Sequence, residues 1–122
     1  MKEIWKDIAG YEGVYQISSY GRVKSLARRL RNGYSIRSRF MRCSLRPRHK
    51  TLKVNLSRDN TAKTFDVHLL VLRAFAGDAE SGYVAHHVDG DKMNNHLDNL
   101  EWVDWPFIWA KTTKGFPNLL GQ

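Results

Sequence analysis

Two adjacent histidines, His86 and His87, are the residues of this sequence best suited to acid–base or metal chemistry. An imidazole titrates close to neutral pH, so it can take a proton from water, and a free ring nitrogen can bind a divalent metal ion. The pair ends an apolar segment, 83–88, and is followed by Asp89 and Gly90, which are typical of a turn. Because neighbours in a strand point to opposite faces, the two imidazoles can serve one site only if the chain bends there.

A strand–loop–strand–helix pattern surrounds the histidine pair. The polar segment 91–99 predicts a loop after the first strand, and the apolar segment 100–103 predicts a second strand. Asp104 is a suitable helix N-cap and Gly115 a suitable helix end, so a helix is predicted from about 104 to 114. The last third of the chain therefore predicts two strands and a helix around the imidazoles.

The first two thirds predict short strands, turns and one helix. Residues 27–38 predict a basic loop around a turn at 32–33, and apolar residues at helical spacing predict a helix over 68–76 that ends at Gly77. Residues 58–61 predict the turn of a hairpin. The segments that predict strands are 14–18, 22–26, 40–45, 51–56 and 64–67.

Positive charge is concentrated in the middle of the chain. The 122 residues carry 20 Lys and Arg against 12 Asp and Glu, a formal charge of +8. Residues 22–73 hold 15 of these cations and two acids, whereas the rest holds five cations and ten acids. A surface that needed only solubility would mix both signs, so this segregation favours a nucleic-acid site. The cations predicted to contact DNA are Arg22, Lys24, Arg28, Arg29, Arg31, Arg37, Arg39, Arg42, Arg46, Arg48, Lys50 and Lys53.

Composition excludes several other classes of protein. The single cysteine, Cys43, excludes an internal disulfide and a cysteine-based zinc cluster. No apolar run approaches the roughly 18–20 residues that span a bilayer, so no membrane partner is expected. The first residues contain no apolar signal segment, so we expect a cytoplasmic protein. With 42% hydrophobic residues the chain has enough apolar material for a folded core.

Other polar residues are predicted to have structural roles. His68 begins a predicted helix on its apolar side and is expected to pack or cap rather than react. Asn94 and Asn95 are expected to brace the loop through bonds to its backbone. Asp89 is expected to serve the turn.

Three blocks of the sequence, 5–26, 67–75 and 84–103, follow one another in an order that resembles the HNH homing endonucleases of phages. The last block resembles the nuclease motif, the second the helix before it, and the first a nuclease-associated modular DNA-binding motif. The resemblance implies an α+β fold, with a small antiparallel N-terminal sheet unit followed by a ββα-metal (His-Me finger) nuclease module. It implies a DNA-binding motif and basic arm over 1–50 and the nuclease module over 51–122.

The resemblance also implies roles for individual residues. His87 matches the general base that activates water, His86 the first metal ligand, and Asn99 the asparagine that holds the loop and orients the base. It implies one divalent ion, Mg²⁺ or Mn²⁺, as a Lewis acid, and double-stranded DNA as the substrate. If a phage encodes the chain, its compartment is the cytoplasm of the bacterial host cell. One active module per chain implies a nickase, or a homodimer that cuts both strands.

The chain departs from the family pattern at the last metal ligand, where Ile108 stands in place of the usual His or Asn. Three alternatives stay open: the metal is held by His86, water and phosphate alone, this copy is weak or inactive, or the helix begins elsewhere and the register shifts. Two functions are therefore compatible with the sequence. One is a metal-dependent endonuclease that nicks or cuts duplex DNA, and the other is a nucleic-acid-binding protein derived from such a nuclease.

Overall fold

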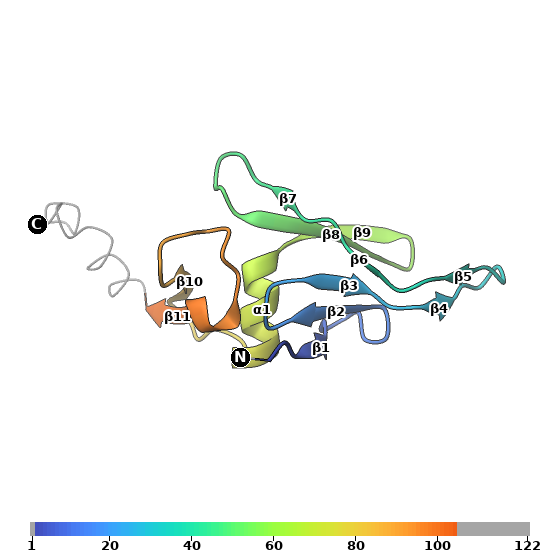
Figure 1. Cartoon of the computed structure of the whole chain (residues 1–122), viewed down its shortest axis with the longest axis horizontal. Coiled ribbons are helices and arrows are strands. Elements are labelled where there is room, and N and C mark those ends of the chain that lie inside the picture. The colour runs from blue at the N-terminus through green and yellow to red at the C-terminus, as the bar shows by residue number, and fades with distance from the viewer. Residues whose placement is uncertain (1, 105–122) are drawn as a thin grey trace, which may run out of the picture.

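The computed structural model describes residues 2–104, which form an α+β fold rich in short strands (Figure 1). The elements in chain order are β1 (Trp5–Asp7), β2 (Tyr15–Ser18), β3 (Val23–Ser25), β4 (Arg28–Arg29), β5 (Ser35–Ile36), β6 (Arg39–Phe40), β7 (Ser44–Leu45), β8 (Leu52–Arg58), β9 (Thr61–Asp66), α1 (Val67–Ala76), β10 (Tyr83–His87), the 3-10 turn η1 (Leu97–Asn99) and β11 (Leu100–Asp104). The helix predicted over 104–114, with Ile108, lies outside these residues.

The N-terminal part is an antiparallel sheet with the strand order β1-β2-β3-β6. Side chains in β2 alternate as the sequence predicted, since Tyr15 and Ile17 are buried. Val23 of β3 is buried beside them and pairs with Ile17. The strands predicted over 14–18 and 22–26 are therefore confirmed.

The basic middle is more structured than the sequence predicted. Within the expected loop 27–38, β4 and β5 pair as a small hairpin that projects from the body of the protein (Figure 1). The single strand expected over 40–45 is two strands, because β6 pairs with β3 whereas β7 pairs with β8. The chain therefore crosses from one sheet to another between these two strands.

The hairpin of β8 and β9 has a tighter turn than expected. Its strands pair as far as Arg58 and Thr61, which leaves only Asp59 and Asn60 at the turn. Both have positive φ, 53° and 63°, the backbone that a two-residue hairpin turn requires and that Asp and Asn tolerate. The hairpin predicted here is confirmed, with β7 added at its edge.

Helix α1 joins the N-terminal sheet to the strands that carry the histidines. It ends at Gly77, as predicted, and buries Val67, Leu70, Val71 and Leu72. It contacts β1 and β2 on one side and β10 and β11 on the other, and it lies between them in Figure 1. One hydrophobic cluster extends from Ile8 to Leu100 and includes buried residues of β2, α1 and β11. No helix within residues 2–104 is long and apolar enough to cross a membrane.

Candidate active site

The histidine pair lies at the end of β10, where it pairs with the start of β11. The two predicted strands pair in a register that places His86 opposite Glu101 and His87 opposite Leu100. Neighbouring side chains point to opposite faces, so the two rings have different partners. Nδ1 of His86 lies 3.1 Å from Oε2 of Glu101, whereas Nε2 of His87 lies 2.9 Å from Oδ1 of Asn95.

The partner of His87 determines which ring nitrogen can act as a base. His87 is buried, with 8% of its surface exposed, and so is Asn95, with 4%. The amide oxygen of Asn95 can only accept a hydrogen bond, so Nε2 of His87 carries the proton and donates it. Nδ1 then keeps its lone pair. In this tautomer Nδ1 is the nitrogen that can take a proton from water.

His86 is oriented by a carboxylate. Nδ1 of His86 donates to Oε2 of Glu101, which leaves the lone pair on Nε2. A histidine that binds a metal through one nitrogen commonly donates the other to a carboxylate in this way. The arrangement around His86 therefore suits a metal ligand, and the two histidines differ in their chemistry because they differ in their partners.

Asn99 holds the loop that follows the histidines. Its Oδ1 accepts from the backbone N–H of Asp89 (3.0 Å), and its Nδ2 donates to Oδ1 of Asp89 and to the carbonyl of Asn94 (both 2.9 Å). The side chain is buried, with 8% exposed. Of the two roles that the resemblance implies for Asn99, loop bracing is thus the one that its hydrogen bonds provide, and the side-chain bond to His87 comes from Asn95.

The carboxylate of Asp89 is occupied by the loop. It accepts from Nδ2 of Asn94 (2.9 Å), from the backbone N–H of Asp91 (2.8 Å) and from Nδ2 of Asn99. These donors, with Asn94 foremost, hold the pKa of Asp89 below its usual value. Asp89 thus braces the turn, as the sequence predicted.

The cations predicted to contact DNA fall into two groups by exposure, half-buried and exposed. Arg22, although exposed, is paired with Glu3 and stacks over Phe40, 4.5 Å from the ring centroid. Arg28 is braced by the carbonyl of Leu26 at 2.9 Å. The half-buried cations are Lys24, Arg28, Arg46 and Lys53, and the exposed ones are Arg22, Arg29, Arg31, Arg37, Arg39, Arg42, Arg48 and Lys50. Most of the predicted cations therefore reach solvent.

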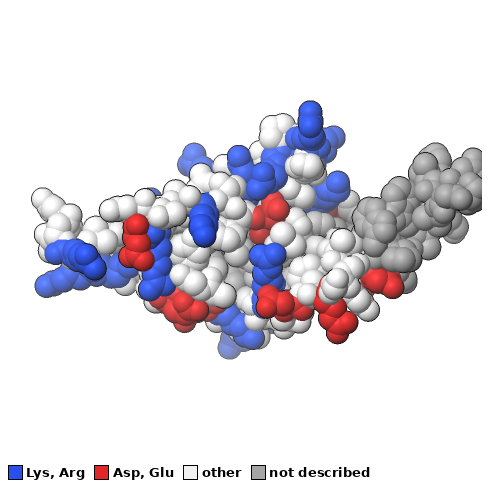
Figure 2. Space-filling view, turned by 180° about the vertical axis from the view of Figure 1, so that it is seen from behind, with Lys and Arg blue, Asp and Glu red and all other residues white. Residues whose placement is uncertain are grey.

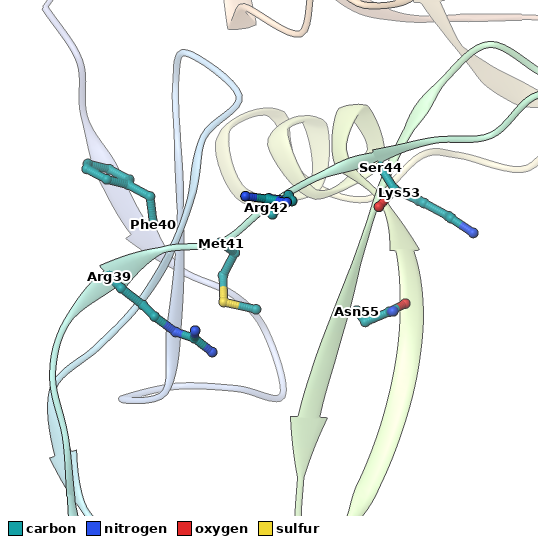
Figure 3. A pocket seen from close by; sticks show the side chains of 7 residues that line it. All are labelled: Arg39, Phe40, Met41, Arg42, Ser44, Lys53 and Asn55. Carbon is teal, nitrogen blue, oxygen red and sulfur yellow. The ribbon is translucent and has the colours of Figure 1, made fainter.

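Basic and acidic side chains are unevenly distributed over the face seen in Figure 2. Figure 2 shows Lys and Arg over the end of the molecule that carries β4 and β5 and along the upper side, whereas Asp and Glu lie mostly along the lower side. Between β6, β7 and β8 a pocket of about 430 Å³ is lined by three of the cations, Arg39, Arg42 and Lys53 (Figure 3). Its other lining residues are Phe40, Met41, Ser44 and Asn55. The pocket combines positive charge with apolar and amide groups.

Comparison with known proteins identifies the family of this chain. Residues 3–67 match the NUMOD4 motif, and residues 66–104 match the HNH endonuclease family. The chain belongs to the HNH endonucleases that carry a NUMOD4 motif. Over 99 residues it is 38% identical to DNA endonuclease I-HmuI of Bacillus phage SP01. The aligned region covers 81% of this chain and 51% of that protein. Over 101 residues it is 35% identical to an uncharacterized HNH endonuclease of Acanthamoeba polyphaga mimivirus, covering 83% of this chain and 27% of that protein.

A solved structure has the same fold as this HNH-family chain. The structure, titled "DNA binding and cleavage by the HNH homing endonuclease I-HmuI", superposes with a TM-score of 0.73 at 35% identity. The match covers 92% of this chain and 58% of that one. The chain thus spans about half the length of the curated phage relative. The resemblance to phage HNH homing endonucleases predicted from the sequence is confirmed.

Two site residues of this HNH-family chain were missed by sequence reasoning. Asn95 was expected to bond only the loop backbone, and Glu101 was given no role, yet each contacts one of the histidines. The strand register contains a usable signal for Glu101, since a hairpin that pairs His87 with Leu100 places His86 opposite Glu101. Asn95 lies in an irregular loop, where no periodicity indicates direction.

The described residues provide part of a metal site. Among residues 2–104 no group of three His, Cys, Asp or Glu side chains lies close enough to hold an ion. The oxygens of Asp89 and Asn99 are used by the loop, whereas Nε2 of His86 keeps its lone pair. One oriented imidazole fits an ion such as Mg²⁺ that keeps several waters and also binds substrate phosphate. Ile108, the position of the usual last ligand, lies outside the described residues.

His68 of α1 packs against the catalytic candidate. Its ring centroid lies 5.0 Å from that of His87, and its Nδ1 is buried without a hydrogen-bond partner among the described residues. Burial first, and then the charge of His87, lowers the pKa of His68 to about 4. His68 is therefore neutral at pH 7.

The half-buried His68 predicts that stability falls as the pH falls. Its folded pKa of about 4 lies below the value of 6.5 for a free imidazole, so between these values the unfolded chain binds a proton that the folded chain excludes. Above pH 6.5 both states are neutral and the penalty disappears. Between pH 7 and pH 4.5 we expect His68 to account for about 1–2 kcal/mol of lost unfolding free energy, after allowance for solvent screening.

Urea unfolding at a series of pH values measures this loss. The variant His68→Leu should show a shallower decline with falling pH, whereas His49→Leu, at an exposed loop position, should retain the wild-type decline. Equal pH dependence in wild type and His68→Leu would show that His68 does not resist protonation.

Proposed function

We propose that this chain is a metal-dependent DNA endonuclease of the homing type, which hydrolyses phosphodiester bonds in duplex DNA. The observation that carries the proposal is the state of His87: buried at the end of β10 and held by Asn95 with Nε2 protonated, so that Nδ1 is left as a base. Family membership and the similarity to the phage protein DNA endonuclease I-HmuI support the same reaction class.

In this proposal Nδ1 of His87 removes a proton from a water molecule. The water oxygen forms a bond to phosphorus, and the bond from phosphorus to the 3′-oxygen breaks with its electron pair on that oxygen. The 3′-oxygen then takes a proton from solvent, which leaves a 5′-phosphate and a 3′-hydroxyl. His86 would hold Mg²⁺ or Mn²⁺, which when bound supplies a positive charge that offsets the developing charge on the phosphate oxygens.

The basic surface supplies a path for the DNA backbone. The cations on the β4–β5 hairpin and on the strands that follow it are mostly exposed, so they can pair with phosphates along the duplex. The solved relative is titled for both DNA binding and cleavage. With one histidine base in each chain, the proposed product is a nick in one strand, and cutting both strands requires two copies of the chain.

The test is incubation of supercoiled plasmid with the wild-type chain and Mg²⁺ or Mn²⁺. We expect conversion to the nicked circle, and we expect excess EDTA to stop it. The second candidate function, a DNA-binding protein with lost catalysis, is favoured by Ile108 in place of the last ligand. It predicts a gel shift of the same DNA without any nicking at any metal concentration, and that result would reject the endonuclease.

The pocket between β6, β7 and β8 is predicted to contribute strongly to DNA affinity. Replacing Arg39, Arg42 and Lys53 by alanine removes three cations from one pocket. If each neutralises one phosphate, the slope of log K against log salt should become shallower by about 3, with an affinity loss of roughly 10–100-fold at low salt. Fluorescence anisotropy of a labelled duplex over a KCl series measures both quantities.

A variant with the same loss of charge controls for the overall electrostatic effect. Lys2, Lys63 and Arg73 are exposed cations outside this pocket, and their replacement by alanine removes three charges as well. We expect this control to change the slope by less than 1. Equal slopes for the two triple variants would remove the pocket from the DNA interface.

A further inference from the structure

The turn between β2 and β3, residues 19–21, contacts residues 95–97 of the loop between β10 and β11. The carbonyl of Ser19 accepts from the backbone N–H of Leu97 at 2.7 Å. The ring of Tyr20 stacks on the ring of His96, with centroids 4.2 Å apart and planes 27° from parallel. Gly21 lies against Asn95. Three consecutive residues of the N-terminal motif thus meet three consecutive residues of the loop that supplies the partner of His87.

Gly21 is required by this contact. Its φ of +87° favours glycine, and a Cβ at this position would lie 2.8 Å from the Cβ of Asn95 and 2.9 Å from its backbone oxygen. Both distances are shorter than side chains tolerate. The backbone of the turn therefore approaches Asn95 more closely than any other residue would allow, and the position of Asn95 depends on that approach.

Asn95 has little else to fix its side chain. Its Oδ1 accepts from Nε2 of His87 at 2.9 Å, but its Nδ2 is buried and has no hydrogen-bond partner among the described residues. An amide normally uses several hydrogen bonds to fix its orientation. Here one bond points at the catalytic candidate, and the close approach of Gly21 to the Cβ and the backbone carbonyl of Asn95 adds a steric restraint.

The turn itself is rigid enough to act as a support. Oγ of Ser18 accepts from the backbone N–H groups of Tyr20 and Arg22, both at 3.1 Å, so its side chain closes the turn. Ser19 is fully buried and makes two hydrogen bonds to Ile4, the residue before β1. Its backbone N–H donates to the carbonyl of Ile4, and its Oγ accepts from the backbone N–H of Ile4. The support therefore reaches back into the N-terminal sheet.

We propose that the β2–β3 turn, residues 19–21, positions the base of the nuclease. It holds Asn95 where its amide keeps His87 in the Nε2-protonated tautomer, so the N-terminal motif completes the active site as well as binding DNA. The role of His87 as the general base rests on the proposed function. The positioning itself is a property of the folded chain and can be measured without DNA.

The test compares Gly21→Ala with Gly10→Ala. Gly10 has a similar φ of +84°, but nothing lies within 4 Å of a Cβ there, so it carries the same backbone strain without the contact. We expect Gly21→Ala to reduce kcat for plasmid nicking by about 10–100-fold with KM unchanged, because the base is displaced while the DNA surface is intact. Gly10→Ala should keep the wild-type kcat and KM.

A second readout is the ¹⁵N NMR spectrum of His87 at pH 8, where an ordinary imidazole is neutral. The wild type should show one tautomer with Nε2 protonated, Gly21→Ala a mixture of tautomers, and Gly10→Ala the wild-type spectrum. A wild-type spectrum for Gly21→Ala would overturn the positioning role. Absence of nicking by the wild type would reject the proposed function, and the spectra would still decide the positioning.

Two further variants keep the inference testable. If Gly21→Ala does not unfold cooperatively, Tyr20→Leu removes the stacking on His96 without backbone strain, and a mixed tautomer with a kcat loss of about 3–10-fold is expected. In a double-mutant cycle, adding Gly21→Ala to Asn95→Ala should cost no further activity, since the amide that the turn positions is already absent. Fully additive losses would show that the turn acts through another route.

Discussion

Replacement of His87 by alanine is expected to reduce the nicking rate by about 10²–10⁴-fold, the usual contribution of a positioned base. Nδ1 of His87 is the nitrogen that Asn95 leaves free to take the proton, and the neighbouring His68 is too acidic to replace it, since burial lowers its pKa to about 4. Single-turnover nicking of supercoiled plasmid at saturating enzyme measures the loss directly.

DNA binding provides the control for this variant. His87 is 8% exposed and offers little surface to a duplex, so the affinity of His87→Ala for duplex DNA should stay within about twofold of wild type. His49→Ala removes an exposed imidazole and should keep the full rate. Nicking by His87→Ala at the wild-type rate would show that this ring is not the base.

Replacement of Asn99 by alanine is expected to damage both stability and activity. The side chain makes three hydrogen bonds that close the loop after β10, and it is 8% exposed. Losing them should cost about 2–4 kcal/mol of unfolding free energy, because the buried partners are left without their bonds. Nicking should fall by roughly 100-fold, since a loop displacement of about 1 Å moves the base. Urea unfolding and plasmid nicking measure the two effects.

The variant Asn99→Asp makes this prediction sharper. It keeps the shape of the side chain and the acceptor for the N–H of Asp89, but it places a carboxylate oxygen where Nδ2 now lies 2.9 Å from Oδ1 of Asp89. Two carboxylates at that distance repel each other, so Asn99→Asp should be at least as harmful as Asn99→Ala at pH 7. Asn55→Ala, which loses one exposed bond to Thr64, should change stability by less than about 1 kcal/mol. Full activity in Asn99→Asp would contradict the loop-bracing role.

The elements around the histidines were predictable because their signals are local. Alternating residues predicted β2, β3 and the β8–β9 hairpin, and helical spacing with Gly77 predicted α1. The apolar segment before His86 and the one after Asn99 predicted β10 and β11. These patterns arise from side chains that face one core, so the sequence alone contains them.

The contacts that complete the site were not predictable in the same way. The bond from His87 to Asn95 depends on the path of an irregular loop, and the contact of Gly21 with Asn95 joins residues 74 positions apart. The division of 40–45 into β6 and β7 depends on which sheet accepts each half. Partners so distant in the sequence leave no periodic signal, because only the assembled fold brings them together.

The placement of α1 restricts how such proteins can exchange parts during evolution. Its two flanks are covered by different halves of the chain, the β1–β2 side and the β10–β11 side, within one continuous cluster of apolar residues. A recombination event that cut just before Val67 would expose one face of α1 to solvent and remove the contact between Gly21 and Asn95. A transplant of the DNA-binding half alone therefore requires a recipient nuclease with a matching helix surface, and the two halves are expected to be inherited together.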